Sequence, residues 1–214
     1  MEYLILVFKM GDNESNLNHE EKKLLLKDYN HRINNDLQAL LAFIKLQRRF
    51  GIDKDEIINS SCVTVASISA IQNIMYNTEH EENFISINEF CEEFMRILNE
   101  YYSEFNIGFS YEIENDFYIR SKKVFHFMFL INEMINLSLD FSFKENDEKK
   151  INFNLEKNGE ECSLIYSDNG SGFKESLKES DFRNLLFDQL VKQIDGNIES
   201  SDNNSIVSIN FSSK

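Results

Sequence analysis

His31 opens a polar stretch whose residue types suit the transfer of a phosphoryl group. Residues 31–38 read HRINNDLQ. Helical spacing places three polar residues on one face: His31, Asn35 and Gln38. It places three apolar residues on another face: Ile33, Leu37 and Leu40. An imidazole directed toward solvent can attack with one ring nitrogen, and amides beside it can position the incoming group. Taken alone, the pattern also fits a structural histidine on a helix surface.

A second candidate is the glycine-containing segment that follows an apolar strand near residue 167. Residues 167–173 read SDNGSGF, which gives the spacing D-x-G-x-G at Asp168, Gly170 and Gly172. In isolation this segment is also an ordinary tight turn. It lies between an apolar strand and a C-terminal helix–strand segment, LVKQIDGNIES.

The segment around His31 resembles a known phosphoacceptor helix. Residues 31–47, HRINNDLQALLAFIKLQ, resemble the helix of a histidine kinase subgroup whose motif begins H-R-x-x-N-N-L-Q. They are also similar to the histidine box of sporulation-type histidine phosphotransferases. The resemblance implies that His31 carries a phosphoryl group, with Arg32, Asn35 and Gln38 beside it.

The D-N-G-S-G segment resembles the first glycine box of the GHKL ATPase fold. In that family the aspartate accepts from the adenine amino group, and the glycines let the backbone approach the nucleotide. The resemblance implies this role for Asp168, Gly170 and Gly172. If Mg-ATP is bound, it adds Asn132 and Glu133 from the asparagine box of the family.

Several positions depart from the ATPase pattern. The magnesium-binding asparagine of the family falls on Leu137, which has no oxygen to offer a hard cation. Asp140 replaces a lysine and brings negative charge toward the triphosphate. Arg183 stands where the second glycine box has its glycine. These departures predict a domain that has kept the ATPase fold but lost or greatly weakened nucleotide binding, with neither cofactor nor metal.

Composition limits the classes of partner. The chain has 214 residues and a formal net charge of −15, which disfavours binding to nucleic acid or to an anionic membrane. The three cysteines have neither disulfide-framework nor metal-ligand spacing. The apolar run at residues 3–8 is too short to span a bilayer. We expect a cytoplasmic protein.

The hydrophobic pattern predicts an α+β chain. Helices are expected over residues 20–50, 53–76, 87–102, 121–143 and 182–194. Strands are expected over residues 107–119, 151–155, 163–166, 197–199 and 206–211. We divide the chain into an N-terminal tail and linker (1–18), a phosphoacceptor and dimerisation hairpin (19–79), and a GHKL-like α/β sandwich (84–214). A lone hairpin cannot bury both apolar faces, so a homodimeric four-helix bundle is expected.

The sequence is compatible with three functions. The first is a histidine phosphotransferase that relays phosphate between receiver-domain aspartates through His31. The second is an active kinase core that phosphorylates His31 with Mg-ATP, and the third is a non-catalytic dimeric adaptor that binds a response regulator. A receiver has an acidic pocket, and basic residues of the first helix could face it: Lys22, Lys23, Lys27, Arg32, Lys45, Arg48 and Arg49.

Overall fold

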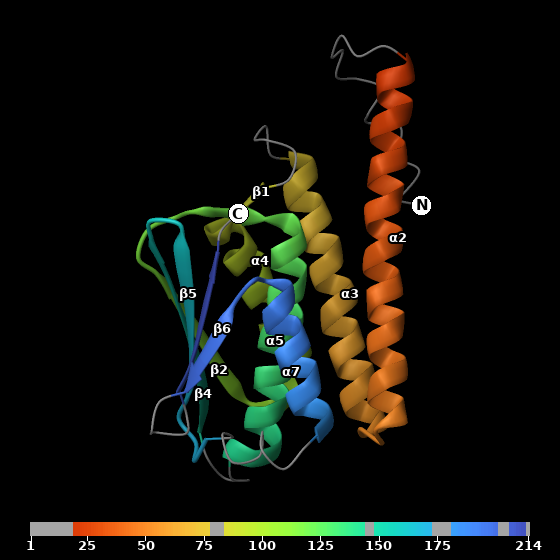
Figure 1. Ribbon diagram of the computed structural model, residues 1–214. Coiled ribbons are helices and arrows are strands. Elements are labelled where there is room, and N and C mark those ends of the chain that lie inside the picture. Colours follow the sequence, from red (N-terminus) through yellow and green to blue (C-terminus); the bar gives the residue numbers. More distant parts are fainter. Residues whose placement is uncertain (1–18, 78–83, 144–147, 173–180, 201–205, 213–214) are drawn as a thin grey trace. The chain divides into compact units, whose positions relative to one another are not determined.

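The computed structural model describes residues 19–77, 84–143, 148–172, 181–200 and 206–212 (Figure 1). The chain divides into two compact units, residues 1–41 and 42–214. The segments at residues 3–8 and 11–18, expected to be an apolar tail and a polar linker, lie outside the described residues.

Helix α2 (His19–Arg49) begins in the first unit and ends in the second. Gly51 follows it with a φ of 76°, a left-handed conformation in which glycine ends helices without strain. Helix α3 (Lys54–Asn77) starts after Asp53, whose Oδ1 accepts from the backbone nitrogens of Asp55 at 2.9 Å and Glu56 at 3.4 Å. The two helices predicted over residues 20–50 and 53–76 are therefore confirmed.

The C-terminal part of the second unit contains a mixed sheet of five strands in the order β2-β4-β5-β7-β6. Their bounds are β2 (Ile107–Ile113), β4 (Lys149–Asn158), β5 (Glu161–Asp168), β6 (Asn197–Ser200) and β7 (Ile206–Ser212). Strand β2 runs parallel to β4, and the other pairs are antiparallel. Burial alternates along β5, so one face of the sheet is packed and the other is not.

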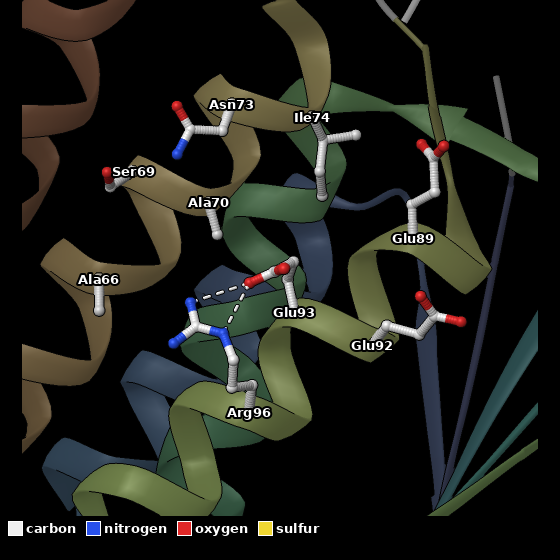
Figure 2. Close-up of a pocket in the computed structure, with 9 residues that line it drawn as sticks. All are labelled: Ala66, Ser69, Ala70, Asn73, Ile74, Glu89, Glu92, Glu93 and Arg96. Carbon is white, nitrogen blue, oxygen red and sulfur yellow. Dashed lines mark hydrogen bonds and ion pairs between the residues drawn. The ribbon is translucent and has the colours of Figure 1, made fainter. Parts of the chain in front are cut away.

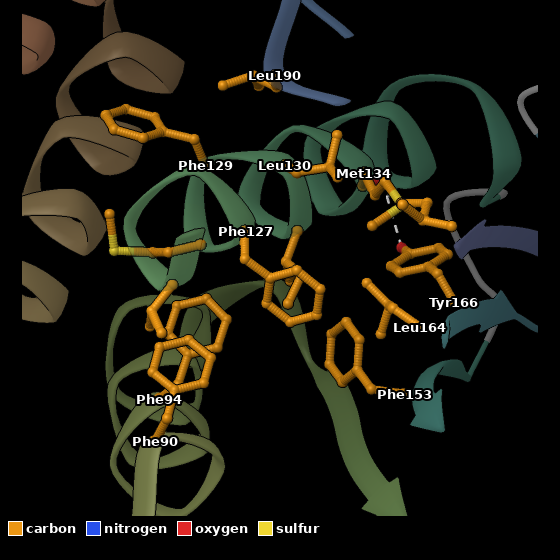
Figure 3. Packing of buried hydrophobic residues seen from close by; sticks show 14 of the residues in the cluster. Phe90, Phe94, Phe127, Phe129, Leu130, Met134, Phe153, Leu164, Tyr166 and Leu190 are labelled. Atoms are coloured by element: carbon orange, nitrogen blue, oxygen red, sulfur yellow. Dashed lines mark hydrogen bonds between the residues drawn. The ribbon is translucent and has the colours of Figure 1, made fainter. Parts of the chain in front are cut away.

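Helices α4 (Ile87–Tyr101), α5 (Ser121–Leu137) and α7 (Asp181–Gln193) lie on one face of this sheet (Figure 1). Helix α5 is central, and a short π-helix, η2 (Ser138–Ser142), extends it. Its side chains pack against α4 on one side and the strands on another; Figure 3 shows Phe127 between Phe94 and Phe153. The predicted α+β class is therefore confirmed, with helices on one face of a mixed sheet.

Two helical segments are long and apolar enough to cross a membrane by composition alone, Lys54–Met75 and Ser121–Ser142. The second is 78% buried inside the fold, which is typical of the core helix of a folded domain.

The strand expected over residues 107–119 is two strands in different sheets. Strand β2 ends at Ile113, and β3 (Tyr118–Arg120) pairs instead with β1 (Phe84–Ser86), a strand that the sequence pattern did not predict. Between β2 and β3, Asp116 accepts from the backbone nitrogen of Asn88 at 3.1 Å and from the hydroxyl of Ser86. These bonds hold the turn against the start of α4, which redirects the chain. A single-turn helix, η1 (Ser103–Phe105), precedes β2.

Candidate functional site

His31 lies in α2 with an exposed side chain. Asn35 and Gln38, one and two turns further along, are exposed as well. The side chain of Arg32 lies outside the described residues. The helix therefore presents an accessible imidazole with two amide side chains on the same face, which is the arrangement that the sequence predicts.

The loop at residues 168–172 brings together the residues of the D-x-G-x-G segment. The Asp168 side chain is buried at the end of β5. One of its carboxylate oxygens accepts from the Ser138 hydroxyl at 2.8 Å. The other accepts from the Ser142 hydroxyl at 2.5 Å and from the Gly170 nitrogen at 2.9 Å. Both oxygens of this carboxylate are thus bonded within the chain.

Ser142, at the end of η2, also binds the rest of the loop. The Ser171 nitrogen donates to the Ser142 carbonyl at 2.9 Å, and the Gly172 nitrogen donates to its hydroxyl at 2.7 Å. A Cβ atom at Gly170 would lie 2.3 Å from the Ser142 carbonyl oxygen, so only glycine fits there. Gly170 therefore allows a close approach of the loop backbone to Ser142, and the amides of Ser171 and Gly172 donate to Ser142.

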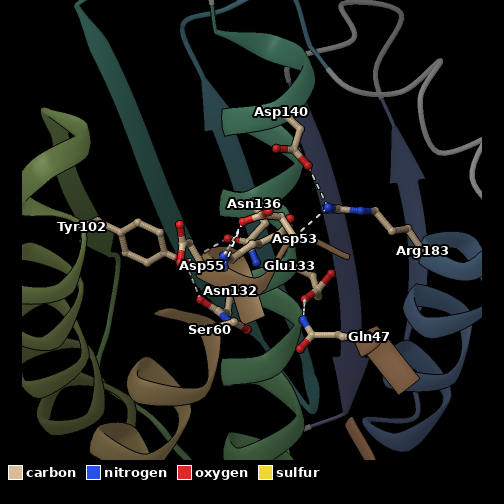
Figure 4. A network of polar contacts seen from close by, with 11 residues as sticks. Gln47, Asp53, Asp55, Ser60, Tyr102, Asn132, Glu133, Asn136, Asp140 and Arg183 are labelled. Carbon is tan, nitrogen blue, oxygen red and sulfur yellow. Dashed lines mark hydrogen bonds and ion pairs between the residues drawn. The ribbon is translucent and has the colours of Figure 1, made fainter. Parts of the chain in front are cut away.

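Asn132 and Glu133 face a different neighbourhood, shown in Figure 4. Asn132 is fully buried; its Oδ1 accepts from the Tyr102 hydroxyl at 2.7 Å and its Nδ2 donates to the Ser60 hydroxyl at 2.6 Å. Asn136, one turn later, lies 3.0 Å from the same Tyr102 hydroxyl. Asn132 thus contacts α3 and the residue that follows α4, whereas the Ser138 and Ser142 hydroxyls that bond to Asp168 belong to η2.

Glu133 is a buried acid in this network. It is 1% exposed, and its Oε1 lies 3.5 Å from the Gln47 Nε2, which donates to it. Burial raises the pKa of Glu133 to about 7, although Arg183 opposes the shift. Near neutral pH, the carboxyl is therefore divided between its protonated and ionised forms.

Arg183 is the charged centre on the other side of Glu133 (Figure 4). Its side chain is 5% exposed, and its Nη2 donates to Glu56 Oε1 at 2.8 Å and to Asp140 Oδ2 at 2.7 Å. Two of the departures seen in the sequence, Asp140 and Arg183, are thus partners. Their opposite charges could have predicted from the sequence that Asp140 and Arg183 form an ion pair. No feature of the sequence pattern indicated that Glu56 would join them.

A separate pocket of about 440 Å³ lies between α3 and α4 (Figure 2). Small side chains of α3, such as Ala66 and Ala70, face a row of acids on α4 there, and Glu93 is paired with Arg96 at 2.9 Å. Within the described part of the chain, none of the predicted site residues lines this pocket.

One family model matches part of the chain. Residues 28–102, which include His31 and all of α3, match the histidine kinase family HisKA_2. A comparison with curated proteins finds no match.

Several similar solved structures are histidine kinases or their domains. The histidine kinase domain of the blue-light activated kinase from Erythrobacter litoralis EL346 covers 87% of this chain and 94% of its own, with a TM-score of 0.62 at 13% identity. A longer structure of that kinase gives a TM-score of 0.61 at 13% identity over 84% of this chain, which spans 63% of its length. The nucleotide-free catalytic domain of histidine kinase ThkA covers 61% of this chain and 95% of its own, with a TM-score of 0.50 at 15% identity.

At these identities the likeness establishes the fold alone. Residues 28–102 match the histidine kinase family model, and the chain as a whole has an α+β fold like that of a histidine kinase domain.

Proposed function

We propose that this protein is a histidine phosphotransferase of a two-component phosphorelay, which carries a phosphoryl group on His31 between receiver-domain aspartates. The exposed imidazole supports this role, as does its place in the segment that matches the histidine kinase family. Asn35 and Gln38 share its face of α2 and would position the phosphoryl group, with Arg32 as a further candidate.

The proposed step is a direct displacement at phosphorus. A ring nitrogen of His31 attacks the aspartyl phosphate of a receiver, and the N–P bond forms as the P–O bond to the aspartate breaks. The carboxylate leaves on the receiver, and the second ring nitrogen of His31 keeps its proton. Transfer to the next receiver is the same displacement in reverse.

The observation that carries the choice of phosphotransferase over kinase is the closed loop at residues 168–172. Asp168 is buried and already accepts three hydrogen bonds, from Ser138, Ser142 and Gly170, so little of its acceptor capacity is left for an adenine amino group. The amides of Ser171 and Gly172 would have to leave Ser142 before they could approach a nucleotide. Each of these exchanges opposes nucleotide binding, because a buried group that loses its partner costs free energy.

Charge opposes nucleotide binding as well. Arg183 is paired with Glu56 and Asp140 rather than available to neutralise phosphate, and Leu137 is fully buried with no oxygen for a magnesium ion. We therefore propose that the protein needs neither Mg-ATP nor another cofactor.

Basic side chains along α2 support a receiver as the partner. Five of them are exposed in the described residues: Lys23, Lys27, Lys45, Arg48 and Arg49. In a chain of net charge −15, this helix could attract the acidic pocket of a receiver that the remainder of the surface repels. We propose a cytoplasmic location, which the acidic composition and the three free cysteines fit.

We also propose that the protein is a homodimer, because helix surfaces that should be buried are exposed in a single chain. Leu37 and Leu41 are 49% and 51% exposed on α2. On α3, Ile58 is 61% exposed and Val65 50% exposed, with the exposed Cys62 between them. The spacing 58, 62, 65 is that of a helix–helix seam, so a second copy could complete a four-helix bundle.

Ile58→Asp is expected to convert the dimer into a monomer, because it places a charge in the proposed seam. Sedimentation equilibrium of the wild type and the variant measures this directly. Leu185→Asp is the matched control, since Leu185 is 53% exposed on α7 and lies outside the seam. A monomeric wild type, or a dimer that survives Ile58→Asp, contradicts the proposed seam.

One labelling experiment tests the proposed function. The protein is incubated with γ-labelled ATP and Mg²⁺ and, separately, with a receiver phosphorylated by a small phosphodonor. Label on His31 from the receiver alone supports the phosphotransferase. Label from ATP would make the protein a kinase, and label from neither source would leave an adaptor, so either result overturns the proposal.

A further inference from the structure

Arg183 joins three segments that are distant in the sequence. Its side chain extends from α7, and one terminal nitrogen contacts both Glu56 on α3 and Asp140 in η2. The three residues are called here the Arg183 bridge. The bridge therefore connects a helix of the family-matched segment with two elements of the C-terminal domain.

The side chains of the Arg183 bridge are largely buried. Their burial favours the one arrangement of α3, α7 and η2 in which they remain paired. The Arg183 side chain is 5% exposed and that of Glu56 19% exposed, whereas Asp140 is 41% exposed at the edge. A buried guanidinium that loses its carboxylates keeps the cost of desolvation without the compensating attraction. Any movement of α7 relative to α3 that separates these groups is therefore strongly opposed.

Another contact between α3 and the C-terminal domain is uncharged, since the Asn132 Nδ2 donates to the Ser60 hydroxyl at 2.6 Å. Hydrogen bonds between charged groups are roughly twice as strong as those between neutral groups, and Arg183 makes two of them, at 2.7 and 2.8 Å. The bridge is thus the contact best suited to define the orientation of the C-terminal domain on α3.

We propose that Arg183 is a positioning residue that fixes the C-terminal domain on α3 in one orientation through Glu56 and Asp140. This inference rests on the proposed phosphotransferase function, because a domain that delivers no ATP gains nothing by moving relative to α3. A fixed orientation instead reduces the ordering cost when a receiver docks.

The test measures orientation separately from transfer. Spin labels are attached to Asn73→Cys on α3 and Asp188→Cys on α7, two exposed positions, in a Cys62→Ser background. Labelled chains are mixed with excess unlabelled protein, so that each dimer carries one labelled copy. Electron–electron resonance then gives the distance distribution between the two helices.

The wild type should give one narrow distribution, and Arg183→Gln should broaden it at least about twofold and slow transfer to His31 about tenfold. Arg96→Gln is the matched control, since Arg96 pairs only with residues of its own helix in the described part of the chain, Glu93 and Glu100. If Arg183→Gln fails to fold, Glu56→Gln and Asp140→Asn each remove one partner and decide the question.

A narrow distribution in all folded bridge variants overturns the proposed role of Arg183. The two proposals fail separately. If the bridge variants broaden the distribution but the wild type shows no transfer to His31, the positioning role stands and the phosphotransferase function is refuted. If transfer is normal and the distribution stays narrow in the variants, the phosphotransferase function stands and the positioning role is refuted.

Discussion

His31→Ala is expected to lower phosphoryl transfer from a phosphorylated receiver by at least about a thousandfold, because the variant lacks the attacking nitrogen. The exposed position of His31 on α2 means that its loss should leave the fold intact. Quantitative transfer kinetics with a labelled receiver, together with circular dichroism of the variant, measure both effects.

His31→Gln and His126→Gln are the controls for this result. Glutamine keeps polarity and length at position 31 but has no nucleophilic ring nitrogen, so it should be as inactive as alanine. His126 is half-buried on α5 and its ring bonds to the Lys122 carbonyl at 2.8 Å, so its replacement should retain transfer. Label that persists in His31→Ala, or that disappears only in His126→Gln, contradicts the assignment of His31.

Glu133→Gln is expected to change how stability depends on pH. Burial raises the pKa of Glu133 from 4.5 to about 7, so the folded protein binds a proton that the unfolded chain releases between those values. Below about pH 4.5 both states are protonated, and stability of the wild type falls as pH rises toward 7. Above pH 7 the ionised carboxylate costs the folded state on the order of 3 kcal/mol.

The variant removes this cost because glutamine stays neutral, and its amide can still accept from Gln47. Urea unfolding at pH 5, 6, 7 and 8 should show the variant gaining stability over the wild type as the pH rises. Glu112→Gln on β2 is the control, since Glu112 is exposed and its replacement should give a constant difference. A constant difference for Glu133→Gln would show that Glu133 is not a buried titrating acid.

The long elements could be predicted from the sequence because each carries a periodic apolar pattern. Helix α5 was expected over residues 121–143, and the structure has α5 with η2 over residues 121–142. Between the two strands predicted over residues 151–155 and 163–166 lies Asn158-Gly159, a common sequence for a tight turn, and Gly159 has a φ of 67°. In these segments local preference and tertiary packing agree.

The pattern failed where long-range contacts decide the structure. Strand β1 has three residues, which are too few to show the alternation of apolar and polar residues that predicts a strand. It forms because β3 pairs with it. The parallel pairing of β2 with β4 brings together residues about forty positions apart in the sequence, which no local pattern records. In the candidate site, the sequence identified Asp168 but not Ser138 and Ser142, since serines at a helix end have many ordinary roles.

The attachment of the 168–172 loop to Ser142 has a thermodynamic consequence under the proposed function. A kinase draws on ATP, which drives phosphorylation in one direction. A carrier without nucleotide adds no free energy of its own and exchanges phosphate with its partners by mass action. The occupancy of His31 would therefore follow the ratio of phosphorylated to free receivers on both sides, and the net flow would reverse when that ratio reverses.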